Sequence, residues 1–281
     1  MNVAFTPPVP GERIVNAAGL RYDVGALLGE GGFGMVFEAA DEWGNPLVLK
    51  VLKPTATFEQ VRGNWEREIT KLGIMRHPNI VYLHDWFVHR GSVFCMVLER
   101  CESPLEKLPL DQRYAMMGPL ARDVLEGLFF IHRNSYVHKD MHAGNVLLHR
   151  QRCPLTGQTA VSFRISDLGI SNLEGVIGQG TTVMAQWMMP PERFNPGEFG
   201  PVSKQTDLYH FALLLLEIMA RRPLKFSHEE ILAGGPRTLA QNMRHPVADV
   251  LARALRRHVA QRPASALDMW RELFHAGLRA G

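Results

Sequence analysis

The chain has 281 residues, of which 46% are hydrophobic and 21% charged, a composition typical of a globular protein with one large core or two smaller ones. The formal net charge of +3 is too small to indicate a nucleic-acid partner, and the longest apolar run, "FALLLLEIMA", is too short for a membrane span. The three cysteines have no spacing typical of a metal site, so we expect free thiols and a cytoplasmic location.

A flexible leader is expected over residues 1–20. Its first part, "MNVAFTPPVPGER", has prolines and an acidic residue where a secretory signal needs a cationic end and an apolar stretch. The folded domain is then expected over residues 21–281.

The next element is a glycine-rich stretch, "LLGEGGFGMVFEAADEWGNPLVLKVLK", in which Gly29, Gly31 and Gly34 fit the spacing G-x-G-x-x-G. In a Rossmann unit these glycines would open a helix of about ten residues. Here "MVFEAA" is rich in β-formers, "DEWGNP" is rich in turn residues and "LVLKVL" is again typical of a strand, which leaves no room for that helix. We therefore predict a hairpin and a further strand that carries Lys50.

Lys50 lies in the middle of an apolar run, where a charge is costly unless it is paired. The following segment "EREI" offers two carboxylates, Glu66 and Glu68, as partners. The alternatives are an exposed helix face for either carboxylate and an unpaired position at a sheet edge for Lys50.

Three later stretches have distinctive patterns. In "HKDMHAGN", Asp140 and Asn145 lie on a predicted loop between a helix and a strand, where an Asx-type turn is the alternative to a functional role. The stretch "HRQRCPLTGQTAVSF" predicts an extended hairpin with its tip near Leu155 to Gln158. The basic run "RALRRHVAQR" predicts a solvated helix face, with polyanion binding as the alternative.

Taken in order, these stretches resemble the eukaryotic-type (Hanks-type) protein kinases, serine/threonine kinases in particular, from about Tyr22 to Phe274. "GEGGFGMV" and "LVLK" resemble the first two signatures, "EREITKLGIMRHPNIVYLHDWF" the helix C region, "MVLERC" the hinge and "YVHKDMHAGNVLL" the catalytic loop. "ISDLG" resembles the metal-binding turn, "MMPPE" the end of the activation segment, "DLYHFALLLLEIM" the central helix and "RPASALDMW" the terminal helices.

The resemblance implies an α+β fold with two lobes. The small lobe, residues 21–100, would be an antiparallel β-sheet with one main helix. The large lobe, residues 101–281, would be mainly helical, and ATP would lie in the cleft between the lobes.

The resemblance also implies catalytic roles. Lys50 would bridge the α- and β-phosphates of ATP, held by Glu68, which stands nine residues before the His77 of "HPNI" as the family expects. Asp140 would accept a hydrogen bond from the substrate hydroxyl and take its proton late. Asn145 and Asp167 would hold Mg²⁺ through hard oxygen ligands.

The nucleotide would be held by backbone and apolar groups. The glycines bring the backbone close to the phosphates, Phe33 closes the loop, and Val36, Val48 and Leu147 enclose the adenine, although plain core packing also accounts for the last three. The full set expected to contact ATP is Leu28, Gly29, Glu30, Gly31, Gly32, Phe33, Gly34, Met35, Val36, Val48, Lys50, Glu99, Cys101 and Leu147.

Two structural contacts are implied as well. Glu192 of "PPE" should pair with Arg262 in a buried bidentate contact that holds the activation segment. Asp207 should cap the backbone of the catalytic loop.

The sequence departs from the family pattern at three places. Lys139 replaces an arginine and loses the planar fork that grips a phosphorylated residue. His142 replaces the lysine typical of Ser/Thr kinases. Ala185 stands where a substrate-positioning threonine usually lies, with Thr181, Thr182 and Ser171 nearby as candidate phosphorylation sites or ordinary loop residues.

The sequence therefore predicts an ATP- and Mg²⁺-dependent transfer of the γ-phosphoryl group to a protein hydroxyl, Ser or Thr rather than Tyr. Two alternatives remain: a nucleotide-binding pseudokinase scaffold and a small-molecule kinase of related fold. The intact set of catalytic residues opposes the first alternative. Glu192, Asp207 and Arg262, which build a platform for a peptide, oppose the second.

Overall fold

A computed structural model describes residues 5–32, 34–152, 155–168, 172–173 and 189–279. It divides the chain into two compact units, Met1–Arg100 and Cys101–Gly281, at the boundary that the sequence predicts between the lobes. Within the described residues, no helix is both long enough and apolar enough to cross a bilayer.

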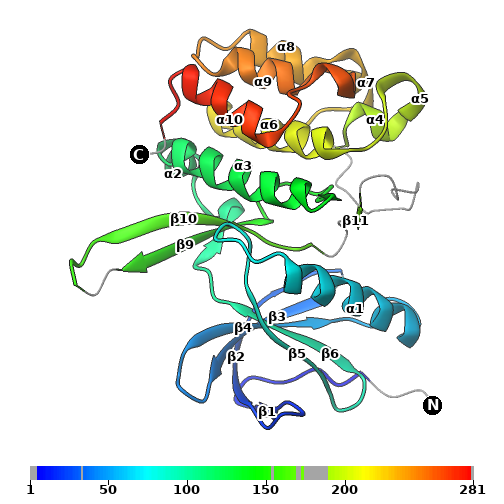
Figure 1. Cartoon of the computed structure of the whole chain (residues 1–281), viewed down its shortest axis with the longest axis vertical. Coiled ribbons are helices and arrows are strands. Elements are labelled where there is room, and N and C mark those ends of the chain that lie inside the picture. Colours follow the sequence, from blue (N-terminus) through cyan, green and yellow to red (C-terminus); the bar gives the residue numbers. More distant parts are fainter. Residues whose placement is uncertain (1–4, 33, 153–154, 169–171, 174–188, 280–281) are drawn as a thin grey trace. The chain divides into compact units, whose positions relative to one another are not determined.

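The small unit contains a six-stranded antiparallel sheet and one helix (Figure 1). The strand order in the sheet is β1-β2-β3-β4-β6-β5. Strands β4 and β6 are neighbours in the sheet, but the main helix α1 (Phe58–Ile74) and β5 separate them along the chain. The strands are β1 (Arg13–Val15), β2 (Arg21–Glu30), β3 (Gly34–Asp41), β4 (Pro46–Leu52), β5 (Leu83–His89) and β6 (Val93–Glu99).

The two faces of this sheet differ in composition. In β4, Leu47, Leu49 and Val51 belong to a buried hydrophobic cluster. Because side chains alternate along a strand, Val48 and Lys50 lie on the opposite face. The apolar run "LVLKVL" thus places one charge among buried neighbours, and that charge needs a partner.

Helix α1 supplies the partner, and its sequence explains where it begins. Thr57 caps the helix by accepting a hydrogen bond from the backbone N–H of Gln60, whose side chain returns a bond to Thr57. Trp65 packs its ring against Phe94 of β6, with the ring centroids 5.2 Å apart. Its indole Nε1 donates to the carbonyl of Cys95 at 3.2 Å, so the helix is tied to the sheet by a polar contact as well as by packing.

The expectation of a flexible leader over residues 1–20 is wrong for its second half. Arg13–Val15 form the edge strand β1, paired antiparallel with β2, and Ile14 is only 1% exposed. Phe5 also packs against the hydrophobic cluster of the sheet. The prolines suggested disorder, but a short apolar edge strand needs only one partner strand and a place in the core.

The large unit is mainly helical (Figure 1). Its described elements are β7 (Ser103–Pro104), α2 (Leu110–Ala115), α3 (Met117–Arg133), β8 (Tyr136–Val137), β9 (Val146–Arg152), β10 (Thr159–Ile165), β11 (Asn172–Leu173), α4 (Pro191–Phe194), α5 (Pro196–Phe199), α6 (Lys204–Ala220), α7 (His228–Ala233), α8 (Gly235–Gln241), α9 (Ala248–Ala254) and α10 (Ala266–His275), with 3₁₀ turns at Leu105–Lys107 and Val259–Gln261. Helix α6 is buried along nearly its whole length, which explains the continuous apolar run "FALLLL".

The extended hairpin predicted before the metal-binding turn is present. Strands β9 and β10 pair antiparallel in continuous register from Val146↔Ile165 to Arg152↔Thr159. Figure 1 shows the hairpin extending away from the helices of its unit, and Leu155 near the tip is 94% exposed.

The single helix face predicted for the basic run at residues 253–262 is wrong. Helix α9 ends at Ala254, and the chain continues through the 3₁₀ turn Val259–Gln261 to Arg262, which is 5% exposed. The charge of Arg262 faces the interior because it pairs with a buried carboxylate.

Candidate active site

The glycine-rich stretch is a hairpin, as the sequence predicts. Strands β2 and β3 pair antiparallel, and the N–H of Gly31 donates to the carbonyl of Gly34 at 2.9 Å across the turn. A Cβ at Gly34 would lie 2.8 Å from the carbonyl oxygen of Val51, so the neighbouring strand requires glycine there. Phe33, predicted to close the loop, lies outside the described residues.

Packing does not explain the other glycines of the loop. A Cβ at Gly29, Gly31 or Gly32 would meet no described atom within 4 Å, and none of the three has a left-handed backbone. Open space above a glycine backbone is what a phosphate needs in order to approach the N–H groups closely. The loop therefore fits the phosphates of a nucleotide.

Lys53 braces this loop. Its Nζ donates to the carbonyl of Gly31 at 2.9 Å and lies 2.6 Å from Oε1 of Glu30. Glu30 was predicted to contact the nucleotide, whereas no role was predicted for Lys53. A basic residue directly after a strand that is paired with the glycine hairpin was the available signal.

Two of the three predicted apolar contacts to adenine, Val36 and Val48, fall on one face of the sheet. Val36 pairs directly with Lys50 across β3 and β4, and Val48 lies two residues from Lys50, so the three side chains share a face. Met35 differs, because its side chain packs against the hydrophobic cluster on the other face. Met35 is among the residues predicted to contact ATP, and such a contact would have to come from its backbone.

Lys50 and Glu68 form the predicted pair. Nζ of Lys50 lies 2.7 Å from Oε1 of Glu68, and the two side chains are 15% and 7% exposed. Glu66, the alternative, forms an ion pair with Arg62 on the exposed side of α1. The ion pair between β4 and α1 offsets the cost of the buried charges and fixes the position of the lysine.

The predicted hinge residues lie at the end of β6 and just beyond it. The backbone N–H of Glu99 donates to the carbonyl of Tyr82, and the side chain of Glu99 accepts from the backbone N–H of Tyr82. These two hydrogen bonds hold the end of β6 in place. Cys101 is buried. Leu147 is half-buried in β9, opposite Pro104 and Arg164.

Asp207 of α6 holds the catalytic loop by its backbone. Its Oδ2 accepts from the N–H of His138 at 2.8 Å and its Oδ1 from the N–H of Lys139 at 2.7 Å. Asp207 is fully buried, and His132 of α3 adds a third contact at 2.8 Å that sequence reasoning missed. Lys139 has φ 71°, and the bond to its N–H stabilises this left-handed conformation.

The loop brings Asp140 and Asn145 together. Nδ2 of Asn145 donates to the carbonyl of Asp140 at 2.9 Å and approaches its Oδ2 at 3.4 Å. The amide therefore turns its nitrogen to the loop, and its oxygen has no partner among the described residues and is available to a ligand. Asp167, the second predicted metal ligand, follows β10 on an exposed turn with φ 57°.

His142 faces the catalytic carboxylate. Its Nε2 lies 3.5 Å from Oδ2 of Asp140, while its Nδ1 accepts from the N–H of Gly144 at 3.0 Å. Burial by itself would lower the pKa of His142, but the hydrogen bond and charge of Asp140, with the charges of Glu106 and Asp167, raise it above the ordinary value. The histidine thus keeps part of the positive charge that a lysine would carry there.

Lys139 is shielded from solvent. It is 7% exposed, and its pKa is lowered by burial and by the nearby charge of Arg193. Arg193 follows Glu192 at the end of the activation segment. The charge of Asp207 acts in the opposite direction and raises the pKa of Lys139.

The predicted Glu192–Arg262 contact is bidentate and buried. The two guanidinium distances are 2.7 and 2.6 Å, and neither side chain is exposed. Thr206 donates to the same carboxylate at 2.8 Å, a contact that was not predicted from the sequence. Arg262 also lies over the ring of Tyr209, 4.6 Å from its centroid.

Several predicted positions lie outside the described residues: Phe33, Ser171, Thr181, Thr182 and Ala185. The candidate phosphorylation sites and the substrate-positioning departure therefore stay predictions.

The protein kinase domain family matches residues 22–275 of the chain. The chain belongs to this family. It is 31% identical to "Cyclin-dependent kinase 10" of Homo sapiens over 215 residues, which cover 73% of this chain and 56% of that protein. It is 25% identical to "Serine/threonine-protein kinase 33" of Mus musculus over 233 residues, 79% of this chain and 47% of that protein. It is also 28% identical to "Cyclin-dependent kinase D-1" of Oryza sativa subsp. japonica over 211 residues, 72% of this chain and 47% of that protein.

The chain thus spans about half the length of the curated relatives it matches. The protein kinase family implies ATP and a divalent cation, and the donor set of this chain fits both. An amide oxygen at Asn145 and a carboxylate at Asp167 are hard ligands of the kind that Mg²⁺ prefers. An ammonium at Lys50 and open glycine N–H groups suit phosphate oxygens.

Proposed function

We propose that this protein kinase domain transfers the γ-phosphoryl group of ATP, with Mg²⁺, to a serine or threonine hydroxyl of a protein. The observation that carries the proposal is the Lys50–Glu68 pair, 2.7 Å long and shielded from solvent. Protein kinases need this pair in place to position the phosphates. The relatives named as serine/threonine or cyclin-dependent kinases support the acceptor class.

Bound ATP with Mg²⁺ would supply the transferable phosphoryl group and a cation that neutralises phosphate charge. Lys50 would contact the phosphates, held in place by Glu68. Asn145 and Asp167 would hold the metal. Because the transition state is loose and highly anionic, these residues act mainly by positioning and charge neutralisation.

Asp140 would orient the acceptor hydroxyl and take its proton. Its Oδ2 is engaged by His142 and Asn145, whereas its Oδ1 has no partner among the described residues. Oδ1 is thus the atom free to accept a hydrogen bond from the substrate. Asp207 contributes by holding the backbone of the catalytic loop, which fixes the position of Oδ1 of Asp140 within the large unit.

Mass spectrometry after incubation with ATP and Mg²⁺ tests the proposal. We expect phosphate on Ser or Thr of a peptide library and none when Asp140→Asn replaces the wild type. A chain that binds nucleotide equally well in both forms without turnover would be a scaffold. Labelling of amino alcohols or aminoglycosides but of no peptide would identify a small-molecule kinase. The cytoplasmic location remains a prediction from the sequence.

A further inference from the structure

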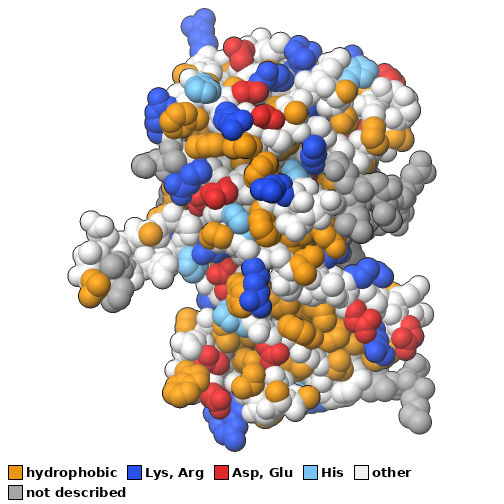
Figure 2. All heavy atoms as spheres, in the orientation of Figure 1, with side chains coloured by type: hydrophobic (Ala, Val, Ile, Leu, Met, Phe, Trp, Pro, Cys, Tyr) orange, Lys and Arg blue, Asp and Glu red, His pale blue; other side chains and the backbone are white. Residues whose placement is uncertain are grey.

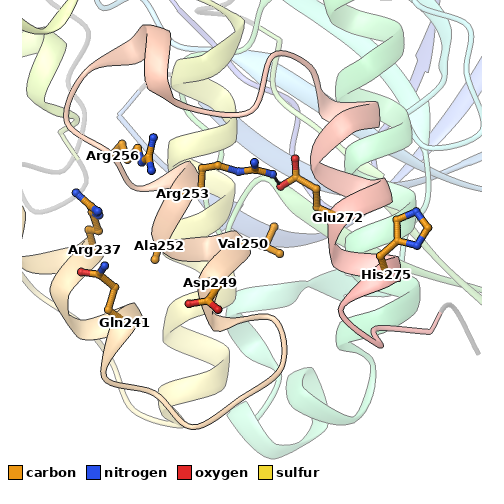
Figure 3. A pocket seen from close by; sticks show the side chains of 9 residues that line it. All are labelled: Arg237, Gln241, Asp249, Val250, Ala252, Arg253, Arg256, Glu272 and His275. Atoms are coloured by element: carbon orange, nitrogen blue, oxygen red, sulfur yellow. Dashed lines mark ion pairs between the residues drawn. The ribbon is translucent and has the colours of Figure 1, made fainter.

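A cavity of about 510 Å³ lies among α8, α9 and α10 of the large unit. Its volume is within the range typical of ligand sites, about 300–1,000 Å³. None of the residues given a catalytic or nucleotide-binding role lines it. The lining residues are Arg237, Gln241, Asp249, Val250, Ala252, Arg253, Arg256, Glu272 and His275 (Figure 3).

Two arginines of this cavity have no acidic partner among the residues that the structure describes. Arg253 is paired with Glu272, but no described carboxylate lies within ion-pair distance of Arg237 or Arg256. Nε of Arg237 is buried and has no hydrogen-bond acceptor among the described residues, whereas buried N–H groups are nearly always bonded. Figure 3 shows Arg237, Arg256 and Gln241 on the same side of the cavity, away from Glu272 and His275.

Arg256 is fixed by its backbone. Its carbonyl accepts from Nε of Arg262 at 2.8 Å, and Arg262 is the residue that binds Glu192. The side chain of Arg256 makes one long contact, from Nη1 to the carbonyl of Gln261 at 3.5 Å. Most of its donors therefore have no acceptor in the described part of the chain, on a backbone that cannot shift without disturbing a buried ion pair.

The rest of the lining suits an extended chain rather than a lone anion. Val250 and Ala252 form a mostly buried apolar floor, while Asp249 offers an exposed carboxylate that can accept from backbone N–H groups. Gln241, Asp249 and His275 are exposed, so the cavity is open to solvent along its rim. The view in Figure 2 shows basic, acidic and histidine side chains interspersed over the part of the large unit that contains α9 and α10.

We propose that this cavity binds an acidic segment of a partner protein, with a phosphate or carboxylate group held between Arg237 and Arg256. The planar forks of two arginines give the bidentate recognition that such anions favour. Binding requires no phosphoryl transfer, so the proposal stands independently of the proposed function.

Peptide binding to the full chain without nucleotide tests this inference. Fluorescence anisotropy would compare four degenerate peptide pools with phosphoserine, phosphothreonine, glutamate or serine at the fixed central position. We expect the two phosphorylated pools to bind most tightly and the serine pool at least tenfold more weakly. Equal binding of all four pools would overturn the proposal.

A double variant locates the site. Arg237→Gln with Arg256→Gln is expected to weaken binding of the phosphorylated pools at least tenfold. The control, Arg222→Gln with Arg271→Gln, removes the same charge from exposed positions outside the cavity and should leave binding unchanged. Equal losses in both double variants would show general charge attraction and contradict the assignment.

Two further measurements separate the remaining outcomes. Hydrogen exchange should slow at residues 237–256 of the wild type when a phosphorylated pool is bound, which requires no variant to fold. Exchange protection elsewhere would place the peptide outside the cavity and overturn the proposal. Inorganic phosphate at the peptide concentration should not displace the peptide; complete displacement would indicate a site for small anions instead of a protein segment.

Discussion

The charge of Lys50 requires a carboxylate beside it, because the lysine lies in an apolar strand. A lysine in the middle of an apolar strand is unfavourable alone, and it is found 2.7 Å from a carboxylate on the next helix. Two glutamates stood two residues apart as candidates, and the helix turns only one of them toward the sheet. Sequence spacing narrowed the choice, and the direction of each side chain from α1 settled it.

Glu68→Gln is expected to lower kcat/KM at least tenfold, because Lys50 loses its anchor. The free energy of unfolding should fall by about 1–3 kcal/mol, since a mostly buried ammonium then lacks its counter-charge. Steady-state kinetics and urea unfolding measure the two effects. Glu66→Gln is the matched control, because its ion pair with Arg62 is exposed and should contribute no more than about 0.5 kcal/mol. Equal effects of the two variants would contradict the assignment.

His142 predicts a pH dependence that a lysine would not have. Asp140 and the other nearby acids raise its pKa above the ordinary value in spite of burial, so the imidazolium persists to higher pH than in a free histidine. Its charge is therefore present at mildly acidic pH and is lost as the pH rises through the raised pKa.

If this charge assists transfer, kcat/KM should fall about threefold or more between pH 6.5 and pH 8.5 in the wild type. His142→Lys should remove that decline, because an ammonium stays protonated to about pH 10. The measurement is the ratio of kcat/KM at the two pH values for each form. An unchanged ratio in the variant would show that another group titrates.

At the scale of elements, helix α6 contacts the catalytic loop and the end of the activation segment, and it also fills part of the core of the large unit. It supplies Asp207 to the catalytic loop and Thr206 to Glu192, and most of its other residues are buried in the core. The run "FALLLL" indicated a buried helix, as the structure shows. The burial of His210, which directly precedes this run, could not be predicted from the sequence. The groups that surround its side chain come from other elements of the fold.

His210 of α6 should make the protein sensitive to acid. It is fully buried, and neither ring nitrogen has a hydrogen-bond partner among the described residues. Burial lowers the pKa of His210 to about 4, although Asp207 and Asp140 act in the opposite direction. The unfolded chain therefore takes up a proton near pH 6.5, which the folded protein accepts only near pH 4.

The titration of His210 leaves the free energy of unfolding unchanged above about pH 6.5. As the pH falls from there toward 4, it lowers the free energy of unfolding by about 1.4 kcal/mol per pH unit. His210→Leu, of similar volume, should remove the contribution, and at pH 5 the variant should be more stable than the wild type by about 2 kcal/mol in urea unfolding. His275→Gln, at an exposed position, is the control. Parallel losses of stability in the His210 variant and the wild type would contradict the prediction.

Across the whole molecule, the large unit is joined by a contact between residues 70 positions apart, Glu192 and Arg262. The arginine fork binds one carboxylate and several backbone carbonyls, so it connects the end of the activation segment with the turn after α9. The position of this bridge explains why the basic run does not continue as a helix.

Arg262→Lys keeps the charge and removes the fork. We expect the free energy of unfolding to fall by about 2–4 kcal/mol, because buried acceptors lose their donors. The double variant Arg262→Met with Glu192→Leu should be more stable than Arg262→Met alone, since it leaves no unpaired charge. Chemical unfolding checks both expectations, and Arg271→Lys on the exposed side of α10 should have almost no effect.

The sequence by itself determined the family, and it predicted a division into two units and the residues to which we assign chemical roles. Those assignments depend on motifs such as G-x-G-x-x-G and "HKDMHAGN". In such short motifs the residues are close along the chain, so their relative positions depend mainly on the local backbone conformation. Only the tertiary structure decided that the leader adds a strand, that Met35 turns away from Lys50, that α9 ends at Ala254, and that Arg237 and Arg256 share a cavity. These features arise where surfaces distant in the chain meet, and spacing along the chain does not specify which surfaces pack together.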